Sequence, residues 1–202
     1  MSSLKHNDEG FTGLEAAIVL IAFVVVAAVF SYVVLGAGFF TTQKAQETVH
    51  TSVQQASSTL EIVGNVYGST AAANTNAGIT SVNFTVALAP GGTAVDFSKV
   101  VLTYSNATVL QTLNQTMPAA GSAYPVTSAI SAGHWAVTEV NNDVGTNNDL
   151  LEAGEQFEVS AMPPNNIMAN DRFTIEIKPS VGAAFDITRS VPGGLNQVNL
   201  LY

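Results

Sequence analysis

The feature that most constrains this chain is a long apolar run near its N-terminus. From Ala16 to Gln43 no residue carries a formal charge, and most side chains are aliphatic or aromatic. The run exceeds the roughly 20 residues that a helix needs to cross about 30 Å of hydrocarbon. No comparable run follows. The sequence therefore predicts one membrane-grade helix and excludes a channel or transporter built from several spans of one chain.

The apolar pattern continues at helical spacing after this run ends. Apolar residues recur every three or four positions through Val63, with polar residues on the other faces. We therefore predict one helix over residues 11–67, softened at Gly36 and Gly38. A lone anchor does not need the amphipathic second half, which packs either on the chain's own head or on helices of other copies. The predicted packing residues are Leu14, Ile18, Ile21, Val25, Val29, Val33, Phe40, Val49, Val53 and Leu60.

The short polar leader before the run suggests an unusual cleavage site. A secretory signal peptide is cut after an apolar region of about 7–15 residues, whereas a cut between Gly10 and Phe11 would leave the whole helix on the mature chain. Mature residue five would then be Glu15. The new α-amine of Phe11, with an ordinary pKa of about 7.7–8.0, would pair with this carboxylate and help to set the register between subunits. Alternatively, Glu15 lies at the membrane interface and interacts only with the helix dipole.

These residues resemble the N-terminus of archaellins, the structural subunits of the archaeal motility filament. The leader, the cleavable Gly10 and the glutamate at mature position five are shared with the wider type IV pilin class, whereas Gly13 and the block Leu35–Ala45 are similar to archaellins in particular. The resemblance covers roughly the first 63 residues. Archaellin leaders usually carry a basic residue just before the glycine, and here Asp8 and Glu9 stand there.

The resemblance implies a complete life cycle for the chain. Residues 1–10 would be a class III signal peptide, removed by a prepilin-type peptidase after transient membrane insertion. The mature chain would polymerise with other copies into an extracellular cell-surface filament, which a basal membrane platform and an ATPase motor rotate for swimming. An adhesive archaeal type IV pilin is the nearest alternative. A membrane-anchored Ig-like ligand-binding protein is the alternative from another class.

The remainder of the chain, residues 68–202, changes from helical to strand periodicity. Apolar residues alternate with polar ones in 82–88 and 173–178, which is typical of half-buried strands. The segment 69–78 is interpreted as the join between helix and head. We expect an α+β chain in which the helix precedes an Ig-like antiparallel β-sandwich. The further predicted strands are 100–104, 108–113, 135–140, 156–161, 185–191 and 198–201.

Composition excludes several classes of function. Six Lys and Arg residues stand against fifteen Asp and Glu, giving a formal net charge of −9 that repels nucleic acid. The absence of cysteine excludes disulfides, thiol catalysis and cysteine-ligated metals. His134 is the one histidine of the head, and no catalytic motif accompanies it. We therefore predict a protein that is not an enzyme and requires no cofactor.

Two further features of the head predict ligands. The loop between 141 and 158 is rich in the hard oxygen donors that calcium prefers, although it lacks EF-hand spacing and a solvated acidic loop with Asx-turns explains it better. Three N-glycosylation sequons begin at Asn83, Asn106 and Asn114, about as many as chance would give, and N-linked glycans are expected there on an exported head. The candidate calcium ligands are Asp143, Asn147, Asp149, Glu152 and Glu155.

Overall fold

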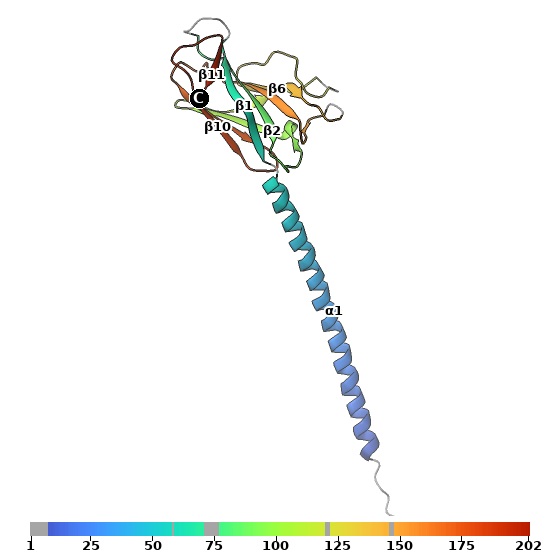
Figure 1. Ribbon diagram of the computed structural model, residues 1–202. Coiled ribbons are helices and arrows are strands. Elements are labelled where there is room, and N and C mark those ends of the chain that lie inside the picture. The colour runs from blue at the N-terminus through green and yellow to red at the C-terminus, as the bar shows by residue number, and fades with distance from the viewer. Residues whose placement is uncertain (1–7, 58, 71–76, 120–121, 146–147) are drawn as a thin grey trace, which may run out of the picture. The chain divides into compact units, whose positions relative to one another are not determined.

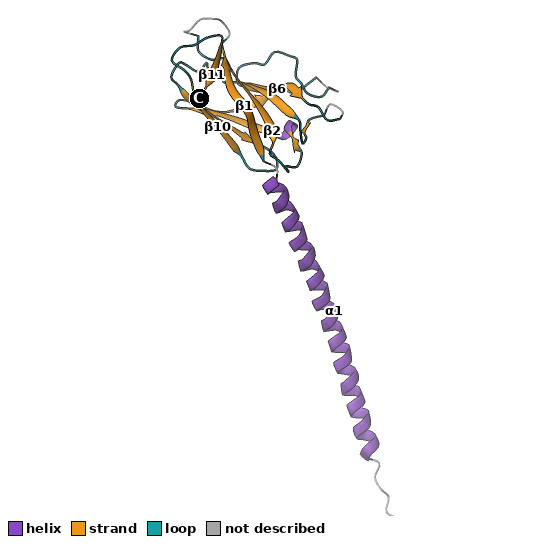
Figure 2. Cartoon of the chain, in the orientation of Figure 1, coloured by secondary structure: helices purple, strands orange, loops and turns teal. Residues whose placement is uncertain are grey.

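The computed structural model describes residues 8–57, 59–70, 77–119, 122–145 and 148–202. The chain divides into two compact units between Thr51 and Ser52. The first contains most of the single long helix α1 (Asp8–Ser57), and the second contains the end of that helix and a head built of strands (Figures 1 and 2).

Helix α1 is 50 residues long, which corresponds to about 75 Å. No proline occurs before Pro90, so no residue in this stretch lacks the N–H that the helical ladder needs. The helix ends at Ser57, ten residues earlier than the predicted end at 67. The prediction was wrong for residues 60–67, which lie in strand β1 (Leu60–Ser69).

The early helix end has a tertiary cause. Strand β1 pairs with the next strand of the chain, β2 (Ser81–Leu88), and with β11 (Val198–Leu201) near the C-terminus. Leu60 is therefore buried in the head instead of facing outward from α1. The positions of Leu60 and Val63 fit a helical stripe as well as a strand, so spacing alone could not separate the two. The segment 69–78, predicted as the join between helix and head, instead connects two strands of the head; residues 71–76 lie outside the described residues.

The head contains eleven described strands and one short 3₁₀ helix, η1 (Phe97–Lys99). All eight predicted strands are confirmed within a few residues, whereas β1 and the two-residue strands β3 and β7 were not predicted. The strands after β1 are β2 (Ser81–Leu88), β3 (Val95–Asp96), β4 (Val101–Asn106), β5 (Leu110–Gln115), β6 (His134–Asn141), β7 (Leu150–Leu151), β8 (Gln156–Met162), β9 (Arg172–Lys178), β10 (Phe185–Ser190) and β11 (Val198–Leu201).

Nine of these strands form one nearly closed sheet. Their order is β10-β9-β4-β5-β6-β8-β2-β1-β11, and β3 pairs separately with β7. The two edges meet where the backbone N–H of Ser190 donates to the carbonyl of Tyr202 at 2.6 Å and the reverse bond spans 3.3 Å. The predicted class, a long helix followed by a β head, is confirmed. One pairing departs from the expected antiparallel pattern, because β5 and β6 run parallel where Asn114 and Gln115 face His134 and Trp135.

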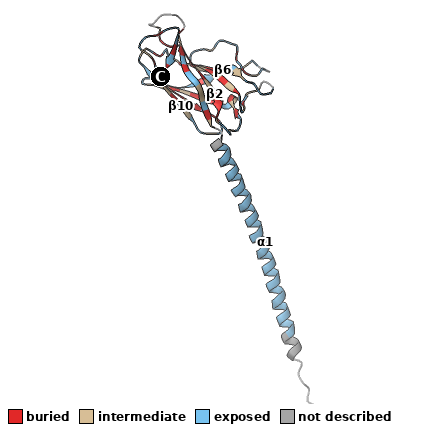
Figure 3. Ribbon diagram, in the orientation of Figure 1, coloured by how far each residue is buried: buried red, intermediate tan, exposed pale blue. Residues whose placement is uncertain are grey.

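The inward faces of this sheet form one hydrophobic core (Figure 3). Its centre is aromatic: the Phe97 ring lies edge-on to Phe157 at 5.0 Å and to Trp135 at 6.5 Å between centroids. These three side chains are at most 1% exposed. The head therefore buries its apolar residues within one chain.

Candidate assembly surface

The side chains of α1 are exposed along its whole described length. Every residue from Gly13 to Gln55 is exposed, and Figure 3 shows this segment in pale blue. The predicted packing residues from Leu14 to Val53 are 54–63% exposed. Leu60 is the exception, at 2%, because it belongs to the head core. Nine of the ten predicted residues therefore lie together on one uncovered helix.

Within the uncharged run, the apolar surface extends around every side of the helix. Other large apolar side chains, among them Phe23, Phe30 and Tyr32, are as exposed as the predicted set. By length and composition the helix could cross a membrane. A helix that is apolar on every face is stable in lipid or inside an assembly, but not in water. This surface is therefore the strongest candidate functional site of the chain.

Four threonine hydroxyls in the second half of α1 are satisfied inside the helix. The hydroxyls of Thr41, Thr42 and Thr48 donate to the carbonyls four residues earlier at 2.8–2.9 Å, and Thr51 donates likewise to Glu47 at 3.0 Å. Such bonds remove the penalty for enclosing a hydroxyl in apolar surroundings. These threonines can therefore be buried by a partner without leaving an unpaired donor.

Charges reappear where the uncharged run ends. Lys44 and Glu47 form an exposed ion pair, with Nζ and Oε2 2.7 Å apart. A pair between neighbouring turns of a helix adds little stability in water. It does give this part of α1 a polar side, in agreement with the predicted amphipathic second half.

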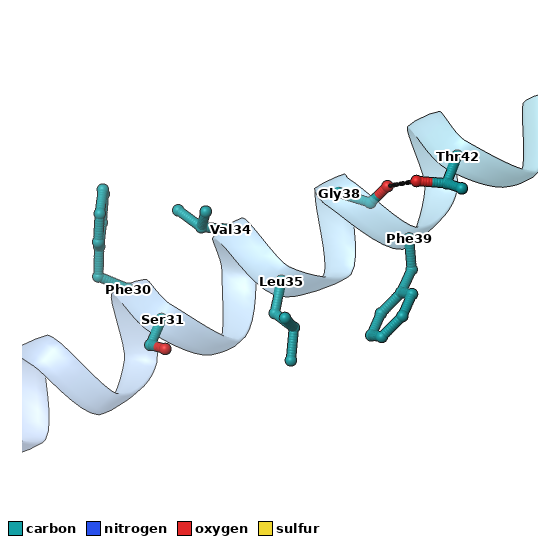
Figure 4. A pocket seen from close by; sticks show the side chains of 7 residues that line it. All are labelled: Phe30, Ser31, Val34, Leu35, Gly38, Phe39 and Thr42. Carbon is teal, nitrogen blue, oxygen red and sulfur yellow. Dashed lines mark hydrogen bonds between the residues drawn. The ribbon is translucent and has the colours of Figure 1, made fainter. Parts of the chain in front are cut away.

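A shallow hollow lies on α1 around Gly38. In Figure 4, Phe30 and Val34 project from one side of the ribbon and Leu35 and Phe39 from the other, with the bare backbone of Gly38 between them. A Cβ added at Gly38, or at Gly36, would meet no atom within 4 Å. Nothing inside the subunit therefore requires glycine at these positions.

The proposed cleavage site lies within α1. Gly10 and Phe11 belong to its first turns, and the helix begins at Asp8, before the predicted cut. The side chains of residues 8–12 lie outside the described residues. Glu15 is exposed one turn further on. The roles predicted for these three residues stay predictions.

The acidic loop is organised by one buried carboxylate. Glu155 is 3% exposed; its Oε1 accepts the N–H of Val144 at 2.8 Å, and its Oε2 accepts the N–H of Glu152 at 3.0 Å. Asp143, Asp149 and Glu152 lie in the same loop, while Asn147 lies outside the described residues. In the described part of the chain, no three His, Asp or Glu side chains gather closely enough to hold a metal ion.

The three sequon asparagines differ in accessibility. Asn114 is exposed on β5, whereas Asn83 is half-buried in the middle of the sheet between β1 and β8. Asn106 closes the turn between β4 and β5, because its Oδ1 accepts the N–H groups of Thr108 at 2.9 Å and Val109 at 2.7 Å. The Nδ1 atom of His134 lies 3.1 Å from the carbonyl oxygen of Ala132.

Comparison with known proteins identifies the family. The chain matches archaeal-type flagellin over residues 10–189. It is 43% identical over 201 residues to probable flagellin 1 of Archaeoglobus fulgidus, with 96% of each chain covered. The structure is similar to the archaeal flagellum of Methanospirillum hungatei strain JF1, with a TM-score of 0.69, 34% identity, and 94% of this chain and 99% of that one covered.

A second solved structure agrees at the level of the fold. The crystal structure of flagellin FlaB1 from Methanocaldococcus jannaschii has a TM-score of 0.59 at 15% identity, covering 70% of this chain and 95% of that one. The exposed apolar helix, the nearly closed β head and the match to archaeal-type flagellins together make this chain a structural filament subunit and not an enzyme. The chain belongs to the archaeal-type flagellin family. The chain is therefore located in an extracellular surface filament, the archaeal flagellum. The two alternative functions, an adhesive pilin and a membrane-anchored ligand-binding protein, are not favoured.

Proposed function

We propose that α1 is held first by lipid, in a membrane-inserted precursor, and then by the α1 helices of other copies in the core of a swimming filament. The uncovered apolar surface from Gly13 to Gln55 carries this proposal. Each Val, Leu, Ile or Phe removed from water contributes about 1.5–3 kcal/mol. The large number of such side chains on α1 makes a water-exposed state unstable at either stage.

The two environments are chemically equivalent for these side chains. Lipid tails and packed aliphatic side chains are similarly apolar, so transfer between them does not require the helix to pass through water. The back-bonded threonines extend this compatibility beyond the uncharged run. Shape complementarity and the polar side of the second half of α1 would then determine how the helices of neighbouring copies align.

Maturation by a prepilin-type peptidase is part of the same proposal. Cleavage between Gly10 and Phe11 would create an α-amine four residues before Glu15, and this pair would set the register of neighbouring helices. In the assembled filament, the chain would transmit the torque of a basal ATPase motor and membrane platform. No catalytic group is needed for that role.

Modification of the head by N-linked glycans is a secondary part of the proposal. Asn114 is the most accessible acceptor, whereas the amide oxygen of Asn106 is already bound by the turn that it closes. We expect Asn114 to be occupied first, and an intact mass equal to that of the unmodified mature chain would reject glycosylation. Calcium binding by the 143–155 loop stays a prediction, to be tested by calorimetry of the full chain at millimolar calcium.

The decisive experiment for the main proposal is N-terminal sequencing of protein sheared from the cell surface. We expect filaments of this chain whose sequence begins at Phe11. A sequence that begins elsewhere would contradict the proposed cleavage, and a monomer outside the cell would contradict assembly through α1. A deletion strain that still swims would contradict the motility role.

A further inference from the structure

Strand β11 carries apolar side chains on its solvent face. Val198, Leu200 and Tyr202 alternate outward and are 59%, 38% and 72% exposed. Leu200 pairs directly with Tyr67 of β1, which is 43% exposed. These four residues are contiguous, because same-face neighbours on paired strands contact each other. We call them the β1–β11 patch.

The side chains of β11 that point inward are less apolar than those that point outward. Asn199 and Leu201 point inward and are 4% and 3% exposed. A shift of one residue would exchange the two faces and bury Val198, Leu200 and Tyr202 instead. Hydrophobic burial within one chain would favour that shifted register. The observed register must therefore be held by something else.

A buried asparagine holds it. The N–H of Asn196 donates to Asn199 Oδ1 at 2.7 Å, and Asn199 Nδ2 donates to the Asn196 carbonyl at 2.7 Å and to that of Gly68, in β1, at 3.4 Å. The neighbouring backbone bond from Thr70 N–H to the Gln197 carbonyl, 3.0 Å, fixes the same register. Displacing Asn199 would leave buried polar groups unpaired. The polar anchor thus keeps three large apolar residues on the outside.

The patch is uncharged on a strongly acidic head. Eleven acidic and four basic residues follow residue 57, which gives the head a formal charge of −7. Copies of such a head repel one another wherever their charges approach. A contact between copies is therefore favoured at an uncharged surface, and tyrosines flanking aliphatic side chains are typical of interface centres.

We propose that the β1–β11 patch is a docking face for the head of a second copy of this chain. This inference rests on the proposed function, because assembly through α1 would tether the heads of neighbouring copies and raise their effective concentration. A patch too small to hold two free heads together is then sufficient. In a helical polymer the contact is heterologous, so the patch meets a different surface of the next copy.

The test compares substitutions at two exposed positions of the head in full-length chains expressed in cells. Leu200→Asp places a charge in the patch, and Leu110→Asp is the matched control on β5, where Leu110 is 77% exposed and lies outside the patch. We expect roughly tenfold or greater loss of filaments for Leu200→Asp, corresponding to at least about 1.4 kcal/mol per contact, and normal filaments for Leu110→Asp. Equal filament yields would overturn the proposal.

A second variant separates assembly from folding. Val198→Thr with Leu200→Thr places β-branched residues, which suit a strand, at both positions but makes the face polar. We expect the detergent-solubilised variant to melt within about 2 °C of the wild type, a shift expected for surface changes, and yet to give fewer or shorter filaments. Normal filaments from this folded variant would contradict the docking role. If wild-type chains also fail to polymerise, the proposed function itself is at fault.

Crosslinking identifies which molecule contacts the β1–β11 patch in the filament. The chain has no cysteine, so Val198→Cys provides a unique attachment point for a maleimide–benzophenone probe on intact filaments. In filaments mixed from isotopically light and heavy copies, we expect light–heavy crosslinks from position 198 to peptides of the head. Crosslinks to α1 of a second copy, to a different protein or only within one copy would each overturn the proposal.

Discussion

Helix α1 and the head bury their apolar residues in opposite ways. In the head, the large core side chains, such as Trp135, Phe97 and Phe157, are less than 2% exposed and are enclosed by one nearly closed sheet. In α1, equally apolar side chains are more than half exposed. One core is therefore closed within the chain, while the other has to be completed by lipid or by other copies. The difference shows that hydrophobic content specifies burial but does not specify which molecule supplies the cover.

The two regions should consequently respond differently to substitution. A change in the head core should lower the stability of a single chain, measured by thermal unfolding. A change on α1 should leave the stability of the head unaltered and act on the helix itself, on membrane insertion or on assembly. The following substitutions test whether the two regions differ in this way.

The largest effect is expected for Val25→Asp in α1. A carboxylate near the centre of a membrane helix costs about 2.5–3.5 kcal/mol, and the same charge would recur in every copy of a filament core. We expect no filaments, with an unchanged melting temperature of the head. Val25→Leu is the control and should assemble normally. Normal filaments from Val25→Asp, seen by electron microscopy of cell surfaces, would refute a shared apolar core.

Phe157→Ala should have the largest effect inside the head. The Phe157 ring packs on Phe97 and lies 5.9 Å from the ring of Tyr124. Removing a buried ring and leaving a cavity should lower the free energy of unfolding by about 3–5 kcal/mol. Leu110→Ala is the exposed control, for which we expect a change within about 0.5 kcal/mol. Urea unfolding of the full chain in detergent measures both, and equal effects would show that the head lacks a tight core.

Glycine-to-alanine changes should have opposite signs in the two regions. A Cβ at Gly68 would lie 2.5 Å from Cδ1 of the buried Ile79, so Gly68→Ala should destabilise the head by about 1–3 kcal/mol. A Cβ at Gly38 meets nothing in the subunit, so Gly38→Ala should stabilise the helix by up to about 1 kcal/mol. Thermal unfolding followed by circular dichroism in detergent separates the two changes. If both substitutions changed stability in the same direction, the head and α1 would not differ in how tightly they enclose these glycines.

The smallest effect is expected at the pair formed by Glu139 and Glu158, which face each other across β6 and β8. Partial burial, and then the neighbouring Glu139 carboxylate, raise the pKa of Glu158 above its ordinary value. The folded chain therefore binds a proton more tightly than the unfolded chain does. Stability from this group is fully present below the unfolded pKa and is lost as pH rises through the folded pKa.

Glu158→Gln removes this repulsion. We expect the variant to be more stable than the wild type at pH 7 by roughly 0.2–1 kcal/mol, the scale of a cross-strand like-charge pair, with the gain shrinking below the ordinary glutamate pKa. Glu61→Gln, at an exposed position on β1, is the control. Melting curves from pH 4 to pH 7 give the comparison, and a gain independent of pH would contradict the explanation.

Much of the architecture followed from local pattern. The absence of charge from Ala16 to Gln43 was enough to predict α1, and strict alternation was enough for β2 and β9. Both signals are local, because periodicity reports which side of an element is apolar. The short pairing of β3 with β7 carries no such signal, since two residues have no period.

The candidate site was predicted in part for the same reason. Nine of the ten predicted packing residues lie exposed on α1, and their packing in a filament core stays a prediction, whereas Leu60 was assigned to the wrong element. The β1–β11 patch was missed because alternation in 198–201 shows two faces but not which one is buried. That choice depends on Asn199 and its bonds to Asn196 and Gly68.

One long apolar helix and a β head are therefore predictable from local sequence, because periodicity and the absence of charge act over neighbouring residues. Long-range packing selects where α1 stops, how nine strands form one nearly closed sheet, and which face of β11 meets solvent. Those outcomes depend on pairings such as Leu60 with Leu88 and Tyr67 with Leu200, between residues far apart along the chain. Such pairings are selected by the collective free energy of the folded head, which no local window contains.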